Sequence, residues 1–156
     1  YRLSKQPTFN ISYGNLKATL EDMGVDELSL VAISQAVINI RQSKLPDPIE
    51  IGNAGSFFKN PVILKKHYQS LQAAFDEVPG YEVSTDEIKV PAAWLIEKAG
   101  WKGYKNGEIG VHSKQPLVLV NFGGGQGQDI KNLSIEIQNS VHKKFGIALD
   151  AEVNII

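Results

Sequence analysis

The chain has 156 residues, of which 42% are hydrophobic and 21% are charged, and its net charge is −1 at pH 7. This composition predicts a folded domain and excludes a disordered or fibrous chain, because it supplies apolar surface for a core without extreme charge. The charge balance argues against a broad nucleic-acid or anionic-membrane surface, so an anionic ligand must be met by local cations. Cysteine is absent, which excludes disulfides and thiolate chemistry.

Neither membrane insertion nor secretion finds support in the sequence. No apolar run reaches the roughly 18 residues of a membrane-spanning helix, and the start lacks a signal-peptide pattern, so we expect a cytoplasmic protein. The chain opens on Tyr1-Arg2-Leu3-Ser4 without methionine. This apolar–polar alternation is typical of a strand already under way, so we expect a fragment of a longer protein.

A short helix is predicted over residues 15–23. Leu16 and Leu20 lie one turn apart and give this segment an apolar face. Gly24 follows and can adopt the left-handed conformation that ends helices.

A second helix is predicted between Ser29, a candidate N-cap, and Pro46, which a helix does not easily pass. Arg41 and Lys44 lie at its C-terminal end, where the helix dipole favours cations, so both residues have a structural explanation that needs no ligand. The apolar face of this helix consists of Leu30, Ile33, Val37 and Ile40.

The run Gly52-Asn53-Ala54-Gly55-Ser56-Phe57-Phe58-Lys59-Asn60-Pro61 is predicted to be an ordered loop. Its glycines and asparagines disfavour a regular helix, and prolines flank it. Ser56 has two interpretations: it takes part in chemistry, or it lies in a tight turn held by the packed rings of the next two residues. A hydrolase is disfavoured, because Ser56 does not stand in a G-x-S-x-G motif.

Two further helices are predicted in the middle of the chain. Residues 62–75 show helical spacing, and Pro79-Gly80 then makes a turn. Pro91 suits a first helical position, and the short helix after it is closed by Gly100. The core-facing stripe of the first of these helices consists of Leu64, Tyr68, Leu71 and Phe75.

The C-terminal third is predicted to contain a strand at residues 117–120, a helix at 128–145 that ends at Gly146, and a final strand. Apolar and polar residues alternate in this last segment, so Glu152 faces solvent or a cleft. Helices and strands in this irregular order predict an α+β fold, with helices packed on a small, largely antiparallel sheet in two layers. We expect one domain over residues 1–156.

Two other kinds of site have little sequence support. The glycine-rich residues 121–128 lie between a strand and a helix, where phosphate loops occur, but they match neither G-x-G-x-x-G nor the P-loop pattern. A flexible surface turn is the simpler interpretation. The histidines lack the spacing of a zinc or iron site, so no metal is predicted. They are His67, His112 and His142.

One set of short motifs extends along the whole chain. The run at residues 52–61 is accompanied by Y-G-N-L at 13–16, K-L-P-D-P at 44–48, A-A-W-L-I-E at 92–97, K-G at 102–103, V-H at 111–112, Q-P-L-V-L-V-N at 115–121 and E-V at 152–153. In order and spacing these motifs resemble the C-terminal, substrate-binding part of the MurB family of UDP-N-acetylenolpyruvoylglucosamine reductases. The family's two FAD-binding domains are expected to lie outside this chain.

The resemblance implies an NADPH- and FAD-dependent reductase. Such enzymes pass a hydride from NADPH to FAD and then to UDP-N-acetylglucosamine enolpyruvate, giving UDP-N-acetylmuramate for peptidoglycan. Ser56 matches the family's proton-donating serine, which quenches the carbanion next to the substrate carboxylate. Glu152 matches a glutamate that stabilises the enolate, acting protonated or through a hydrogen bond. Without the resemblance, its position favours an exposed strand glutamate.

The resemblance also implies substrate-binding residues and a subtype. Lysines and amides suit phosphate oxygens, and a tyrosine both stacks and donates. The segment around Tyr13 resembles the subtype in which a tyrosine loop folds over the substrate. The fragment alone is expected to be inactive and to bind neither FAD nor NADPH; the alternative is a stand-alone nucleotide-sugar or phosphate-binding module without catalysis. The positions that match the UDP-sugar site are Tyr13, Lys44, Asn60, Tyr81, Lys102 and Gln115.

Overall fold

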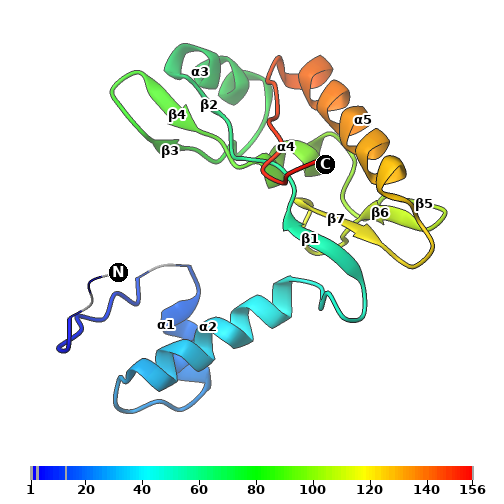
Figure 1. Cartoon of the computed structure of the whole chain (residues 1–156). Coiled ribbons are helices and arrows are strands. Elements are labelled where there is room, and N and C mark those ends of the chain that lie inside the picture. The colour runs from blue at the N-terminus through cyan, green and yellow to red at the C-terminus, as the bar shows by residue number, and fades with distance from the viewer. Residues whose placement is uncertain (1, 3, 13, 156) are drawn as a thin grey trace. The chain divides into compact units, whose positions relative to one another are not determined.

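The chain divides into two compact units, Tyr1–Lys44 and Leu45–Ile156 (Figure 1). The computed structural model describes residues 2, 4–12 and 14–155. Each unit has its own cluster of buried apolar side chains. The prediction of one substrate-binding domain over residues 1–156 stays a prediction.

The Tyr1–Lys44 unit contains the two N-terminal helices predicted from sequence. The first, α1 (Leu16–Asp22), buries Leu16 and Leu20 on its predicted face. Gly24 has a φ of +66°, so the left-handed end predicted for this helix is confirmed.

The second helix, α2 (Leu30–Lys44), packs against α1. Its N-terminus is capped as predicted, because Ser29 Oγ accepts the backbone N–H of Ala32 at 3.1 Å. The helix stops before Pro46, again as predicted.

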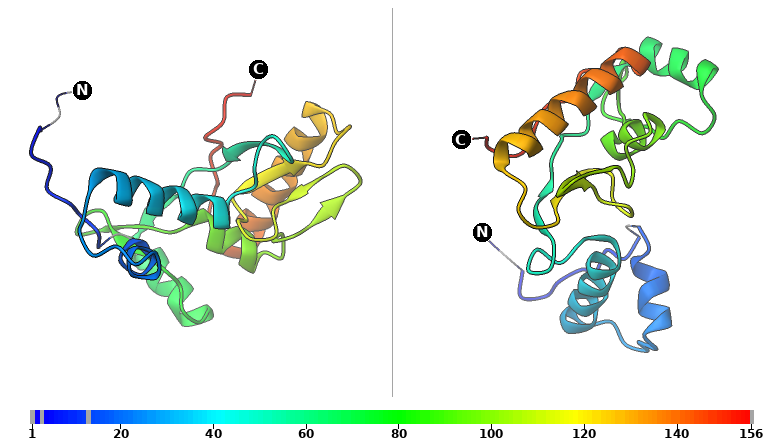
Figure 2. Two further views of the ribbon diagram at one scale, coloured as in Figure 1. Left: turned by 90° about the horizontal axis from the view of Figure 1, so that it is seen from below. Right: turned by 90° about the vertical axis from the view of Figure 1, so that its right-hand side faces the viewer.

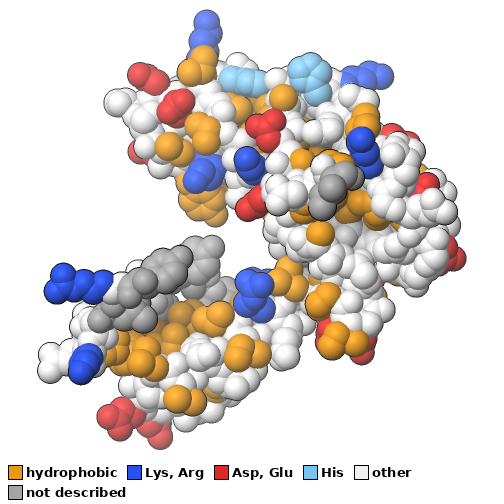
Figure 3. Space-filling view, in the orientation of Figure 1, with side chains coloured by type: hydrophobic (Ala, Val, Ile, Leu, Met, Phe, Trp, Pro, Cys, Tyr) orange, Lys and Arg blue, Asp and Glu red, His pale blue; other side chains and the backbone are white. Residues whose placement is uncertain are grey.

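Apolar side chains gather on the visible surface of the Tyr1–Lys44 unit (Figure 3). Ile33 and Ile40 contact the α1–α2 cluster as predicted, but Leu30 and Val37 are 63% and 40% exposed. The fully buried residue of α2 is Ala36 instead. A contact with one short helix covers only a narrow stripe of α2, so the predicted four-residue stripe was too wide.

The Leu45–Ile156 unit contains a four-stranded sheet with the order β1-β7-β6-β5 and a three-stranded sheet with the order β2-β4-β3. The named strands pair antiparallel, so the predicted α+β fold with an antiparallel sheet is confirmed. The strands are β1 (Gly52–Ser56), β2 (Val62–Leu64), β3 (Tyr81–Glu82), β4 (Glu87–Lys89), β5 (Lys105–Asn106), β6 (Ile109–Val111) and β7 (Val118–Asn121).

Three helices complete this unit: α3 (Lys65–Ala74), α4 (Ala92–Lys98) and α5 (Gly127–Phe145). The long helix α5 contacts β6, β7 and α4, and Figure 2 shows it along one face of the four-stranded sheet. Gly146 ends α5 at a φ of +68°, as predicted. The core between α5 and the sheet includes Ile109, Val111, Leu119, Leu133, Ile137 and Val141.

The predicted loop at residues 52–61 is wrong in its first half, where β1 forms an edge strand against β7. The register is irregular between Asn53 and Ser56. Gly55, with a φ of +75°, provides the backbone conformation of this bulge. Glycine and asparagine disfavour a helix, but an irregular edge strand tolerates both.

Two further segment predictions are partly wrong. The helix expected from residue 62 starts at Lys65, because residues 62–64 form β2 and pair with β4. The expected final strand forms only an isolated antiparallel bridge between Ala151 and Phe58. Buried and exposed residues still alternate in this segment: Ile147 and Leu149 are buried, and Asp150, Glu152 and Asn154 are exposed.

Candidate functional site

Ser56 stands at the end of β1, where the bulge takes the chain away from the sheet. It lies opposite Val118 of β7 in the strand register. The bulge is held by Asn53, whose Oδ1 accepts the N–H of Gly55 at 3.0 Å and whose Nδ2 donates to the carbonyl of Ile51 at 2.9 Å. The backbone around Ser56 is therefore fixed while its side chain is exposed.

The two aromatic residues after Ser56 anchor it in the core. Phe57 and Phe58 are 5% and 1% exposed, and their ring centroids lie 5.1 Å apart. The backbone N–H of Phe57 also donates to the carbonyl of Leu117 at 2.7 Å. The rings are packed as this interpretation predicted, but Ser56 ends a strand instead of lying in a tight turn. Its exposed hydroxyl is available for chemistry.

The segment that carries Glu152 runs antiparallel beside the residues after Ser56. The N–H of Glu152 donates to the carbonyl of Phe57 at 2.8 Å, and the N–H of Lys59 donates to the carbonyl of Asp150 at 2.9 Å. The segments that carry two predicted catalytic residues, far apart in sequence, are therefore joined. The side chain of Glu152 is exposed.

Asn60 links this segment to α4. Its Oδ1 accepts the N–H of Ala92 at 2.9 Å, which satisfies a backbone donor in the first turn of that helix. The amide nitrogen Nδ2 is the group left to donate to a ligand. A capping role and the predicted substrate contact are thus compatible in one side chain.

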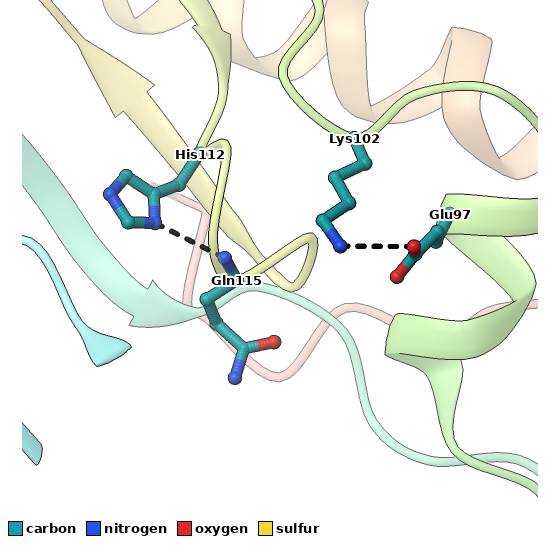
Figure 4. Close-up of polar contacts among 4 residues, drawn as sticks. All are labelled: Glu97, Lys102, His112 and Gln115. Atoms are coloured by element: carbon teal, nitrogen blue, oxygen red, sulfur yellow. Dashed lines mark hydrogen bonds and ion pairs between the residues drawn. The ribbon is translucent and has the colours of Figure 1, made fainter. Parts of the chain in front are cut away.

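Lys102 and Gln115 lie on adjoining turns, and Figure 4 shows the polar contact that each makes. Lys102 Nζ is 2.9 Å from Glu97 Oε1 of α4. A Cβ on Gly103 would lie 3.8 Å from Ser113, so the turn of Lys102 touches the turn of Gln115.

Gln115 is held through its main chain. Its N–H donates to His112 Nδ1 at 3.2 Å, and its carbonyl accepts the N–H of Val118 at 3.0 Å. Burial, and secondarily the charge of Lys114, lowers the pKa of His112 below its ordinary value. The imidazole is therefore neutral at neutral pH, as its acceptor role requires.

The remaining predicted site residues are Tyr81, Lys44 and Tyr13. Tyr81 is 65% exposed in the three-stranded sheet, where it lies opposite Lys89. Lys44 is the exposed last residue of α2 in the Tyr1–Lys44 unit. Tyr13 lies outside the described residues.

A pocket of about 560 Å³ opens between β1, the start of α5 and the C-terminal segment. Phe57 and Val153, the sequence neighbours of Ser56 and Glu152, contribute to its wall. The sequence signal for this hollow was the glycine-rich stretch 121–128, which was predicted to be a surface turn. Its contribution to the wall consists of Asn121, Gly127 and Gln128.

Neither a metal site nor a membrane span is found in the described part of the chain. Among residues 2, 4–12 and 14–155, no three His, Cys, Asp or Glu side chains are grouped so that they could hold an ion. Within the same residues, no helix combines the length and apolar character needed to cross a membrane.

Several known proteins similar to this chain carry the same name. A protein named UDP-N-acetylenolpyruvoylglucosamine reductase from Flavobacterium johnsoniae is 52% identical over 157 residues, covering 100% of this chain and 47% of that protein. A protein of the same name from Amoebophilus asiaticus is 50% identical, and the match covers 99% of this chain and 46% of that protein. Another from Bacteroides fragilis is 44% identical, and the match covers 100% of this chain and 46% of that protein. The chain thus spans about half the length of the curated relatives it matches.

A family model covers most of the same sequence. The UDP-N-acetylenolpyruvoylglucosamine reductase C-terminal domain matches residues 47–156. This range contains β1 with Ser56, the two turns of Lys102 and Gln115, and Glu152. The chain belongs to the family of UDP-N-acetylenolpyruvoylglucosamine reductase C-terminal domains.

Proposed function

We propose that this chain is the substrate-binding part of a reductase that converts UDP-N-acetylglucosamine enolpyruvate to UDP-N-acetylmuramate, with FAD and NADPH as cofactors. The observation that carries the proposal is the hydrogen bond from the N–H of Glu152 to the carbonyl of Phe57. It joins the segment of the proposed enolate-stabilising glutamate to that of the proposed proton donor, Ser56. The substrate is a nucleotide-linked precursor, so the cytoplasm is the proposed location.

The reaction needs a proton at one defined carbon. When bound, the flavin supplies the hydride that adds to the terminal carbon of the enolpyruvyl group. The neighbouring carbon then carries carbanion or enolate character, and Ser56 Oγ–H delivers the proton to it. Glu152 stabilises the enolate, either because the Glu152 carboxyl group is protonated or through a hydrogen bond.

We propose that a flat group held outside this chain approaches the surface next to Ser56. Gly52, Ala54 and Gly55 give β1 small side chains, and a Cβ on Gly55 would meet nothing within 4 Å. An aromatic ring system can therefore approach this edge strand closely. The residues that bind FAD and NADPH themselves are proposed to lie outside this chain.

The substrate diphosphate is proposed to lie along the turns beside Ser56. Lys102 supplies a cation, and Asn60 and Gln115 supply amide donors, which together suit phosphate oxygens. Lys44, Tyr81 and Tyr13 are proposed as further substrate-binding residues.

Ser56→Ala in a full-length protein tests the proposal. We expect turnover, measured as substrate-dependent NADPH oxidation, to fall about 10²- to 10⁴-fold while the KM for the UDP-sugar changes little. Because the Ser56 side chain is exposed, thermal stability should not change. Ser70→Ala on the exposed surface of α3 is the matched control and should turn over like wild type.

Two outcomes would contradict parts of this proposal. Undiminished turnover of Ser56→Ala would remove Ser56 from the mechanism. A full-length wild-type protein that binds the UDP-sugar but oxidises no NADPH in its presence would instead support a nucleotide-sugar-binding module without catalysis.

A further inference from the structure

The turn between β6 and β7 is closed by three hydrogen bonds that meet at His112, Gln115 and Val118. The backbone N–H of His112 donates to the carbonyl of Val118 at 2.9 Å, and the N–H of Val118 donates to the carbonyl of Gln115 at 3.0 Å. The third bond uses a side chain: His112 Nδ1 accepts the N–H of Gln115 at 3.2 Å (Figure 4). Of the three bonds, it alone can be removed by a side-chain substitution.

This turn is attached to the segment that presents Ser56. Val118 lies opposite Ser56 in the pairing of β1 with β7, and the carbonyl of Leu117 accepts the N–H of Phe57 at 2.7 Å. A change in the conformation of the turn therefore changes where Gln115 stands relative to Ser56, the proposed proton donor.

The chemistry of the imidazole defines how it can hold the turn. Nδ1 accepts a hydrogen bond only when it carries no proton, so the ring must be neutral with its proton on Nε2. Burial and then the charge of Lys114 lower the pKa of His112, which preserves the acceptor as the solution becomes mildly acidic. The charged group that acts on the ring is Lys114 in the same turn. The Lys102–Glu97 pair belongs to the adjoining turn and α4, and its two charges offset each other.

We propose that His112 is a positioning residue for substrate binding: through Nδ1 it holds the main chain of Gln115 so that the Gln115 amide meets the UDP-sugar. The inference rests on the proposed function, because it needs Gln115 to contact the substrate. His112 itself does not touch the reacting atoms in this scheme. It acts through the turn.

His112→Leu and His112→Asn in the full-length protein separate this role from simple packing. Leucine removes the acceptor, and we expect the KM for the UDP-sugar to rise about 3- to 10-fold, the effect of one net hydrogen bond. The kcat and the KM for NADPH should stay near their wild-type values. Asparagine places Oδ1 near the position of Nδ1, so His112→Asn should restore a KM close to wild type.

The pH profile provides a readout that packing alone would not move. In wild type the KM for the UDP-sugar should rise as the pH falls below 6.5 toward the lowered pKa of His112, because protonated Nδ1 cannot accept the Gln115 N–H. His112→Asn does not titrate in this range, so that rise should disappear. The same profile in both proteins would overturn the inference, even if His112→Leu failed to fold.

Gln115→Ala distinguishes failure of this inference from failure of the proposed function. If Gln115→Ala leaves the KM for the UDP-sugar unchanged, Gln115 is not a substrate ligand and the proposed site is wrong there. If Gln115→Ala raises that KM while a folded His112→Leu does not, the site stands and the positioning role of His112 is overturned.

Discussion

Two glycine-rich segments adjoin at one end of the pairing between β1 and β7 and have opposite roles. The first is β1, and the second is the stretch 121–128 after β7; Gly52 lies opposite Asn121 in the register. Each segment contains an asparagine whose side chain bonds the main chain two residues on. Both segments are rich in glycine and share this bond, so the difference must come from the other contacts that anchor each segment.

The first segment is anchored by apolar rings and the second by polar bonds. After β1 the chain buries Phe57 and Phe58, which leaves Ser56 exposed just before a fixed point. After β7, Asn121 binds three main-chain groups, and the chain then enters α5 through a capping box of Gln126 and Asp129. A glycine-rich segment thus presents a side chain in one case and starts a helix in the other.

Phe58→Ala tests the apolar anchor and should have the largest effect. Phe58 is 1% exposed, and removing such a ring costs about 3–5 kcal/mol of the free energy of unfolding. Urea unfolding would measure the loss. Phe122→Ala in the second segment is the control: this ring is 41% exposed with Lys105 Nζ 4.3 Å from its centroid, so the cost should stay below about 1 kcal/mol. Equal losses would contradict the contrast between the two segments.

Asn121→Ala tests the polar anchor and should have the next largest effect. Asn121 Oδ1 accepts the N–H groups of Gly123 and Gly125 at 3.0 and 3.1 Å, and Nδ2 donates to the Gly125 carbonyl. Their loss should cost about 2–3 kcal/mol and speed amide exchange at both glycines. Asn53→Ala removes two bonds and should cost about 1–2 kcal/mol. If Asn53→Ala lowered the free energy of unfolding more than Asn121→Ala, the second segment would not be the one that depends more on polar bonds.

The sequence predicted helix ends correctly where the end is determined by residues next to it in the chain. Gly24 and Gly146 adopt the positive φ that ends α1 and α5, and Ser29 caps α2, as each pattern predicted. Among the strands that it missed is β1, and it did not identify the partner of the final segment. In both cases the partner lies far along the chain. A period-two or period-3.6 pattern carries no information on which distant strand a glycine-rich segment meets.

The same limit applies to the candidate site. Ser56 and Glu152 were singled out by resemblance to a family. Local chemistry alone explained Ser56 equally well as a turn residue, and it favoured an exposed strand residue for Glu152. The contact that joins their segments, from the N–H of Glu152 to the carbonyl of Phe57, is between main-chain atoms and leaves no trace in side-chain identity. His112 looked isolated because its partner is the main chain of Gln115 rather than a second metal ligand.

Gly55→Ala tests whether the bulge of β1 needs glycine, and should have the smallest effect. Gly55 has a φ of +75° and an added Cβ would meet nothing within 4 Å, so the cost is conformational and should be about 1 kcal/mol.

Gly127→Ala is the matched control in the second segment, since that site is equally open but lacks a positive φ and begins α5. Alanine is the better helix former, so this change should be neutral or slightly stabilising by urea unfolding. Gly55→Asn should recover part of the loss, because asparagine tolerates the left-handed region better than alanine does. If Gly55→Ala and Gly127→Ala behaved alike, the exposure of Ser56 would depend on the Phe57 and Phe58 anchors alone.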